Sequence, residues 1–261
     1  MLTIREYRRA ESLEEAWQLN QKKNNRILGG MIWLNVQKLS IGTAIDLSGL
    51  ALDKIEEDSD QFKIGAMVTL RQLEIHPGLE AYTRGAVKEA LRHIVGVQLR
   101  SMATVGGSIY GRFGFSDVLS VFLSMDTYVE LYKGGLVPLR EYSQRHYDRD
   151  IVTAIIIRKE KADFVYQSVR SNQTDFPTLT CAAARLADGS YRFALGARPG
   201  KACLFKPDTQ ENAAAYGQTV SEAIVTSSNL RGSAEYRKHL AKVFVTRAVE
   251  TLEKRKEAQA C

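Results

Sequence analysis

Residues 98–109, QLRSMATVGGSI, contain the glycine pair Gly106-Gly107, the most informative feature of this 261-residue chain. Two adjacent glycines let a backbone approach a ligand closely, because no Cβ intervenes. Their amides, together with the start of a following helix, can bind a pyrophosphate. Glycine pairs also occur in ordinary turns and where two segments pack closely. The pair alone does not separate these explanations.

A second pair, Gly29-Gly30, follows the short run Arg26-Ile27-Leu28, which predicts a strand. Residues 31–38 after it predict a helix. Neither pair belongs to the G-x-G-x-x-G of a dinucleotide-binding fold or to a Walker loop. The two pairs are therefore compatible with a nucleotide-like ligand, without identifying it.

Local patterns predict most of the remaining elements. Ser12 with Glu15, and Thr69 with Gln72, form capping boxes that open helices. Gly134-Gly135 lies between two apolar runs and predicts a hairpin. Helices are predicted at about 13–24, 31–38, 70–73, 79–94 and 233–254, and strands at 26–28, 44–47, around 55, 62–64, 127–131, 136–139, 150–157, 164–170, 178–186 and 191–197.

The pattern changes after Lys159-Glu160-Lys161, where a domain boundary is expected near residue 160. Residues 1–160 mix helices with strands, whereas residues 161–261 predict a small sheet with helices against it. With 44% apolar residues the chain can bury a core. We therefore expect a soluble α+β protein.

Charge, cysteine content and hydropathy argue against several classes of protein. The 36 basic and 30 acidic residues give a net charge of +6 without a dense basic block, so no nucleic-acid partner is indicated. Cys181, Cys203 and Cys261 are odd in number and lack C-x-x-C spacing, which predicts reduced thiols in a cytoplasmic protein. No stretch approaches the roughly 18 apolar residues of a membrane span, and no secretory signal opens the chain.

Side chains that carry catalysis or bind metals form no recognisable set. The four histidines, His76, His93, His146 and His239, are scattered without metal-ligand spacing. No G-x-S-x-G elbow is present. We expect neither a catalytic side chain nor a metal ligand in this chain.

The order of several motifs resembles the FAD-binding (medium) subunits of the molybdenum hydroxylase, or xanthine dehydrogenase, family. The similarity runs from Tyr7 to about Leu252. The matching pieces are Arg26–Gly30, KIGAMVTLRQL at 63–73, QLRSMATVGGSI at 98–109, Ser116-Asp117, ALGARP at 194–199 and LRGSAEYRKHL at 230–240. The last string and the 98–109 string are the most specific.

The resemblance implies a fold. Two α/β FAD-binding subdomains of the PCMH type, about 1–53 and 54–160, would form an FAD-binding domain over 1–160. A C-terminal flavoprotein domain over 161–261 would contain a three-stranded antiparallel sheet with helices. FAD would lie extended between the two subdomains.

The resemblance also implies a set of cofactor-binding residues. Residues 27–33 and 103–108 would hold the pyrophosphate and neighbouring groups. Asp117 would contact the adenosine-ribityl part, and Ile151 or Val152 would pack on the adenine or the ring system. The implied set is Ile27, Leu28, Gly29, Gly30, Met31, Ile32, Trp33, Thr69, Ala103, Thr104, Gly106, Gly107, Ser108, Ser116, Asp117, Ile151, Val152 and Gln167.

The implied function is that of an oxidoreductase subunit in a heteromeric complex. It would pass electrons from iron–sulfur clusters through FAD to NAD or another acceptor. The implied partners are a small subunit with two [2Fe–2S] clusters and a large subunit with molybdopterin. The substrate would bind the large subunit, so this chain does not select it.

Three departures from the family pattern leave alternatives open. Met31-Ile32 stand where Thr-Asp or Thr-Glu is usual, Ser108 replaces an Asn, and Phe115 replaces a proline. Two or three lost hydrogen bonds, at about 1 kcal/mol each, would weaken FAD binding roughly 30- to 150-fold. One alternative is a non-catalytic assembly subunit with a degenerate flavin site. Another is an unrelated nucleotide-binding module.

Overall fold

The computed structural model describes residues 1–208 and 211–260, and Cys261 lies outside the described residues. The chain forms two compact units. Unit 1 comprises residues 1–72, 97–111 and 127–158, and unit 2 comprises 73–96, 112–126 and the chain from Lys159 onward. Helices and strands are mixed in both units, which confirms the predicted α+β class.

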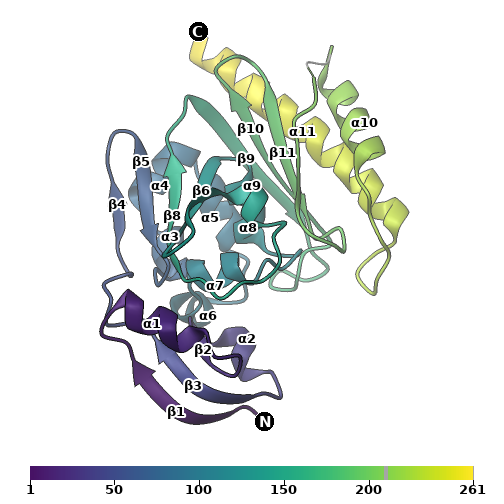
Figure 1. The fold of residues 1–261 in the computed structure, drawn as a ribbon. Helices are drawn as coiled ribbons and strands as arrows, with labels where there is room; N and C mark the ends of the chain where they lie inside the picture. The colour runs from purple at the N-terminus through teal and green to yellow at the C-terminus, as the bar shows by residue number, and fades with distance from the viewer. Residues whose placement is uncertain (209–210, 261) are drawn as a thin grey trace. The chain divides into compact units, whose positions relative to one another are not determined.

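The elements are labelled in chain order (Figure 1). The strands are β1 Thr3–Arg9, β2 Arg26–Leu28, β3 Ser40–Asp46, β4 Ile55–Glu57, β5 Gln61–Gly65, β6 Asp126–Leu131, β7 Gly135–Pro138, β8 Val152–Arg158, β9 Ala162–Val169, β10 Leu179–Leu186, β11 Tyr191–Gly196 and β12 Cys203–Phe205. The helices are α1 Leu13–Asn20, α2 Ile32–Asn35, α3 Leu70–Glu74, α4 Pro77–Thr83, α5 Ala86–Leu91, α6 Val97–Met102, α7 Val105–Tyr110, α8 Asp117–Leu123, α9 Leu139–Tyr142, α10 Ala213–Ala223 and α11 Ala234–Ala260.

Unit 1 begins with a parallel sheet in the order β1-β3-β2. Helix α1 joins β1 to β2, and it starts at the predicted capping box, where the Ser12 hydroxyl accepts from the Glu15 amide at 3.1 Å. Ala16 of α1 packs with Ile45 and Leu47 in a small core. This packing fixes the direction of β2, which ends directly before Gly29-Gly30.

The second sheet of unit 1 has the order β4-β5-β8-β6-β7. Strand β8 lies at its centre, and the six residues from Val152 to Ile157 are all buried, as their apolar run predicts. Helix α7 packs against β8. The predicted hairpin between β6 and β7 is confirmed, and Gly135 there adopts φ 64°, a left-handed conformation that favours glycine.

Unit 2 is built on an antiparallel sheet in the order β12-β11-β10-β9. Helices α10 and α11 run side by side along one face (Figure 1), where Leu179, Phe193 and Phe244 share a core. Helix α8 covers the other face, and Ser120 hydrogen-bonds Thr180 there. The three predicted strands are present, and the short β12 joins them at the edge.

Two helix predictions were wrong in extent. The helix expected over 79–94 is divided into α4 and α5, because Arg84 and Gly85 both adopt left-handed backbones, with φ 48° and 81°. The helix expected over 31–38 is only the four residues of α2. Helix α10, which was not predicted, is capped by Asn212.

The compact units are not contiguous in sequence. Helices α4, α5 and α8 come from the first 126 residues, yet they pack with the C-terminal sheet in unit 2. An exchange of this kind has no local signal, so a sequence pattern cannot reveal it. The division into 1–160 and 161–261 therefore stays a prediction about sequence domains.

Candidate functional site

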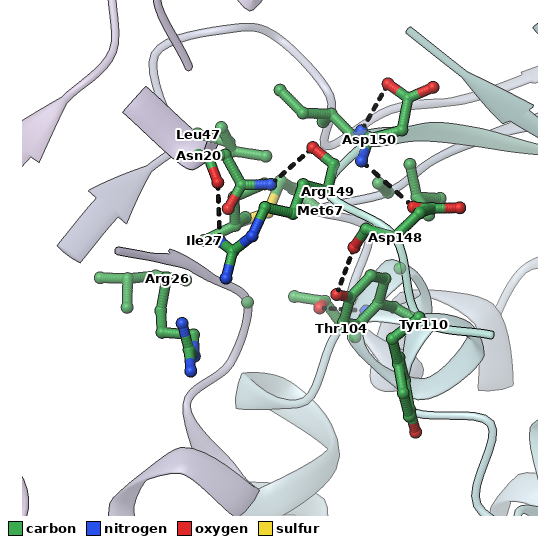
Figure 2. A pocket seen from close by; sticks show the side chains of 18 of the residues that line it. Asn20, Arg26, Ile27, Leu47, Met67, Thr104, Tyr110, Asp148, Arg149 and Asp150 are labelled. Atoms are coloured by element: carbon green, nitrogen blue, oxygen red, sulfur yellow. Dashed lines mark hydrogen bonds between the residues drawn. The ribbon is translucent and has the colours of Figure 1, made fainter. Parts of the chain in front are cut away.

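A cavity of about 390 Å³ lies within unit 1 (Figure 2). Its volume falls in the range of about 300–1,000 Å³ that is usual for ligand pockets. The lining residues are Asn20, Asn25, Arg26, Ile27, Leu28, Gly29, Leu47, Ala66, Met67, Thr104, Gly106, Gly107, Tyr110, Tyr147, Asp148, Arg149, Asp150, Ile151 and Val152. Both predicted glycine-pair loops contribute to it.

The two glycine loops pack tightly. A Cβ at Gly29 would lie 2.8 Å from the Thr104 Oγ1, and one at Gly30 would lie 1.9 Å from the Met102 carbonyl oxygen. A Cβ at Gly106 would lie 2.6 Å from the Ala66 carbonyl oxygen. Close packing therefore requires these glycines whether or not a ligand is bound. The packing also places Gly29, Gly106 and Gly107 on one cavity.

The amides of the two loops differ in availability. In the second loop, Val105 and Gly106 donate to the carbonyls of Val68 and Ala66, and Gly107 donates to the Thr104 hydroxyl. In the first loop, the amides of Gly29, Gly30 and Met31 have no acceptor within the part of the chain that the structure describes. The first loop thus supplies unused donors for an anion, and the second loop mainly supplies shape.

Met31 adopts an unusual backbone for its residue type. It caps α2 with φ 59° and makes no side-chain cap hydrogen bond. A left-handed backbone at a residue with a Cβ costs about 1–2 kcal/mol, and glycine or asparagine avoids most of that cost. The departure from the family pattern at this position thus lies in a strained turn beside the unused amides.

Arg149 ties the cavity wall together. Its Nη1 donates to the carbonyls of Asn20 at 2.8 Å and Lys22 at 3.0 Å, and its Nη2 donates to Lys23 at 3.0 Å. Its own carbonyl accepts from the Asn20 Nδ2 at 2.9 Å. Figure 2 shows both residues, with each side chain bonded to the other's backbone carbonyl. Among the described residues, no carboxylate forms an ion pair with Arg149.

Two aspartates also line the cavity, but backbone amides occupy them. Asp150 accepts from the amides of Lys133, Gly134 and Ile151, and Asp148 accepts from the Asp150 amide. These bonds shape the loop before β8. The two carboxylates therefore stabilise the turn and do not form an ion pair with Arg149 or Arg26.

Two tyrosines hold the same loop against α7. The Tyr110 hydroxyl donates to the Asp148 carbonyl at 3.2 Å, and the Tyr147 hydroxyl donates to the Gly111 carbonyl at 2.6 Å. The two rings lie 5.6 Å apart between centroids. Together with Ile27, Met67 and Ile151, they give the cavity a largely apolar wall.

The predicted site residues divide into three groups. Ile27, Leu28, Gly29, Thr104, Gly106, Gly107, Ile151 and Val152 line the cavity. Gly30, Met31, Ile32, Trp33, Thr69, Ala103 and Ser108 belong to unit 1 but do not line it. Ser116, Asp117 and Gln167 belong to unit 2.

Asp117 lies in a buried polar cluster of unit 2. It is 5% exposed, its Oδ1 lies 2.5 Å from Arg170 Nη2, and it also accepts from the Tyr166 hydroxyl. Burial raises the pKa of Asp117, and Arg170 opposes that shift. Ser116 caps α8 by accepting from the Leu119 amide at 3.1 Å. Both side chains are engaged within the chain, and Gln167 is a half-buried residue of β9.

Several lining residues were missed by sequence reasoning. Arg26 was part of the quoted first loop, and Arg149 and Asp150 directly precede the predicted Ile151 contact. Their positions next to predicted residues were the available signal. Asn20 and Tyr110 gave none, because their partners lie 129 and 38 residues away.

The donor set fits a nucleotide with a diphosphate. An apolar wall can hold a flat base, while unused amides and uncompensated guanidinium groups can hold phosphate oxygens. No group of three or more His, Cys, Asp or Glu side chains that could hold a metal occurs in residues 1–208 and 211–260. Over the same residues, no helix is both long and apolar enough to cross a bilayer.

Two family models together match nearly the whole chain. Residues 3–159 match the FAD binding domain in molybdopterin dehydrogenase, and residues 164–252 match the CO dehydrogenase flavoprotein C-terminal domain.

Individual proteins and structures are similar over most of their length. Uncharacterized protein YgfM of Escherichia coli (strain K12) is 27% identical over 248 residues, which cover 93% of this chain and 94% of that protein. The nicotine 6-hydroxylase medium subunit of Paenarthrobacter nicotinovorans is 24% identical, covering 93% and 95%. A chain of carbon monoxide dehydrogenase from Hydrogenophaga pseudoflava shares the fold with a TM-score of 0.85 at 22% identity, covering 96% and 97%.

Proposed function

This chain belongs to the FAD-binding medium subunits of the molybdenum hydroxylase family, and we propose that it passes electrons from iron–sulfur clusters of a partner subunit through FAD to NAD or another acceptor. FAD is the cofactor of this family. Bound flavin supplies both one-electron and two-electron chemistry, which no ordinary side chain provides. The chain's own residues bind and orient that group.

One observation carries the proposal. The first glycine loop presents the amides of Gly29, Gly30 and Met31 without acceptors among the described residues, beside a cavity that Gly29 lines. An amide that a ligand removes from water needs an acceptor, so these amides can bind one that the ligand supplies. A diphosphate is the acceptor that this geometry suits best.

Different residues at the cavity would bind different parts of the cofactor. Ile27, Met67 and Ile151 form an apolar wall for the adenine, and the first loop holds the diphosphate. The Thr104 hydroxyl accepts from Gly107 at 3.2 Å, which orders the second loop, and the same hydroxyl lies beside Gly29 of the first loop. These contacts would exclude water from the adenosine part and fix where the rest of the cofactor lies.

The proposed partners are a small subunit with [2Fe–2S] clusters and a large subunit with molybdopterin, in a cytoplasmic complex. The nicotine 6-hydroxylase relative is a medium subunit, which supports an assembly of this kind. No metal-ligand group occurs in the described residues, which is compatible with clusters on another chain.

Purification under native conditions tests the proposal. We expect the chain to show flavin absorbance, or to gain it when FAD is added. Reduced iron–sulfur partner should then bleach the flavin, and NAD or an artificial acceptor should restore the absorbance. A chain that stays colourless with FAD, even with its partner subunits present, would contradict the proposed function.

A second candidate is a non-catalytic assembly subunit with a degenerate flavin site. Met31 favours it, because this residue is strained, offers no polar contact and is followed by the apolar Ile32. It predicts a stable complex that binds no FAD. The double variant M31N/I32D would then create FAD binding. Asparagine is chosen at 31 because a β-branched threonine would be strained at φ 59°.

A further inference from the structure

We propose that Arg149 holds the diphosphate of FAD through the Nε/Nη2 edge of its guanidinium group. The inference rests on the proposed function and names a ligand-binding residue that lies outside the motifs of the family. Arg149 is one of the residues that line the cavity (Figure 2).

The guanidinium group is fixed before any ligand arrives. Three of its five N–H groups donate to the carbonyls of Asn20, Lys22 and Lys23. The Arg149 carbonyl in turn accepts from the side chains of Asn20 and Gln21, at 2.9 and 3.2 Å. A side chain that is already ordered loses little entropy on binding, so each further hydrogen bond gains more affinity.

Two N–H groups remain. The Nε–H and one Nη2–H have no acceptor in residues 1–208 and 211–260. Nε and Nη2 are neighbours on one edge of the planar group, and that edge binds phosphate or carboxylate with two parallel hydrogen bonds. The Nη1/Nη2 edge of the guanidinium thus donates to protein carbonyls, and the Nε/Nη2 edge keeps two N–H groups that a ligand can accept from.

Arg149 also forms no ion pair among the described residues. The nearby carboxylates of Asp148 and Asp150 accept from backbone amides, and the three bound carbonyls are neutral dipoles. Arg26, the other guanidinium at the cavity, likewise donates to the carbonyls of Lys23 and Asn25, at 2.6 and 2.7 Å. An anionic group in the cavity would provide a charge partner for both guanidinium groups.

This assignment explains how the chain can dispense with polar residues at 31 and 32. A bidentate charged contact from the loop before β8 would replace the lost Thr-Asp contacts. The amides of Gly29, Gly30 and Met31 and the Arg149 edge would then share one diphosphate.

The test compares ligands with and without phosphate. Apoprotein of the full chain is titrated with FAD, and ADP and adenosine are measured by competition. We expect Arg149→Gln to weaken FAD and ADP about 10- to 100-fold, as loss of a charged hydrogen-bonded pair predicts. Adenosine should weaken less than about threefold. Arg149→Lys keeps the charge but cannot donate two parallel hydrogen bonds, so its affinities for FAD and ADP should lie between those of the wild type and Arg149→Gln.

Matched controls keep the outcomes distinct. Arg5→Gln removes the same charge from exposed strand β1 of unit 1 and should change none of the affinities. Equal losses for ADP and adenosine in Arg149→Gln would show that Arg149 only clamps the wall, and unchanged affinities would show that it does not contact the ligand. Either result overturns the inference. Wild-type protein that binds no FAD would instead overturn the proposed function, and with it the ligand that the inference requires.

Discussion

Gly29 and Thr104 lie in contact across the two glycine loops, so that a Cβ on Gly29 would come within 2.8 Å of the Thr104 Oγ1. The Thr104 hydroxyl is itself held, because it caps α7 by accepting from the Gly107 amide. The first loop is therefore seated on the second, 75 residues later in the chain. The unused amides of the first loop are positioned by this contact.

Replacing Gly30 by alanine should displace the first loop. The new Cβ would fall 1.9 Å from the Met102 carbonyl oxygen, a backbone atom that cannot move without moving α6. We expect G30A to lose at least tenfold in FAD affinity and to lower the thermal midpoint of the apoprotein. Fluorescence titration with FAD and a thermal melt measure the two effects.

Gly217→Ala provides the control for general destabilisation. Its Cβ would meet the Lys242 carbonyl oxygen at 2.7 Å between α10 and α11 of unit 2. This variant should also melt earlier, but its FAD affinity at low temperature should stay near that of the wild type. If G30A bound FAD as tightly as G217A did, the first loop would not be part of the binding site.

Met31 offers a test of backbone strain. Asparagine tolerates φ 59° better than methionine, and threonine tolerates it worse. We expect M31N to stabilise the apoprotein, and M31T to destabilise it, by about 1 kcal/mol each. Urea denaturation followed by circular dichroism measures both. Equal stabilities of the two variants would mean that residue 31 does not adopt the left-handed conformation.

Arg237 has a structural role within the family motif at residues 230–240. The side chain is fully buried, and it donates to the carbonyls of Thr178, Ser227 and Gly232 and to the Asn229 Oδ1. We expect R237A to cost about 3 kcal/mol or more in unfolding free energy, because buried acceptors lose their donor. R237K should recover only part of this, since one ammonium cannot reach four acceptors.

Chemical denaturation of R237A, beside K238A at the exposed neighbouring position, checks this expectation. A loss in R237A no larger than that in K238A would mean that Arg237 does not organise the 227–232 loop. FAD affinity is not expected to change, because Arg237 lies in unit 2 and does not line the cavity.

The buried thiol of Cys181 gives a pH dependence of known sign. Burial raises the pKa of Cys181 from 9.0 to about 12. Between these values the unfolded thiol has lost its proton and the folded thiol has kept it. The free energy of unfolding should therefore fall as pH rises from 9 to 12, by up to about 1.4 kcal/mol per pH unit.

Two measurements check the Cys181 thiol. The slope of stability against pH above 9 should be shallower in C181A than in wild type. Iodoacetamide at pH 8 should leave Cys181 unlabelled in the native protein and label it in denaturant, as mass spectrometry can show. Rapid native labelling would mean that the thiol is accessible and that its pKa is not raised.

The sequence predicted those parts of the fold that depend on local signals. The Ser12 cap of α1 and the Gly135 hairpin involve residues within a few positions of each other, and both are confirmed. The break between α4 and α5 was missed because Arg84 is an uncommon residue for a left-handed cap, although Gly85 beside it was visible.

The candidate site was predictable only where a motif marks it. The glycine loops and Ile151 were named from the family resemblance, and they do line one cavity. Arg149 was not named, because its acceptors lie 126 to 129 residues away. Asp117 was named, but its partners Tyr166 and Arg170 lie 49 and 53 residues away, so its burial in a polar cluster could not be foreseen.

A crystal structure of the FAD-loaded protein would locate the diphosphate. We expect diphosphate oxygens within about 3 Å of the amides of Gly29 and Gly30, with the adenine against Ile151. A diphosphate bound elsewhere, or a cavity closed by the chain's own side chains while FAD is bound at another place, would contradict this expectation.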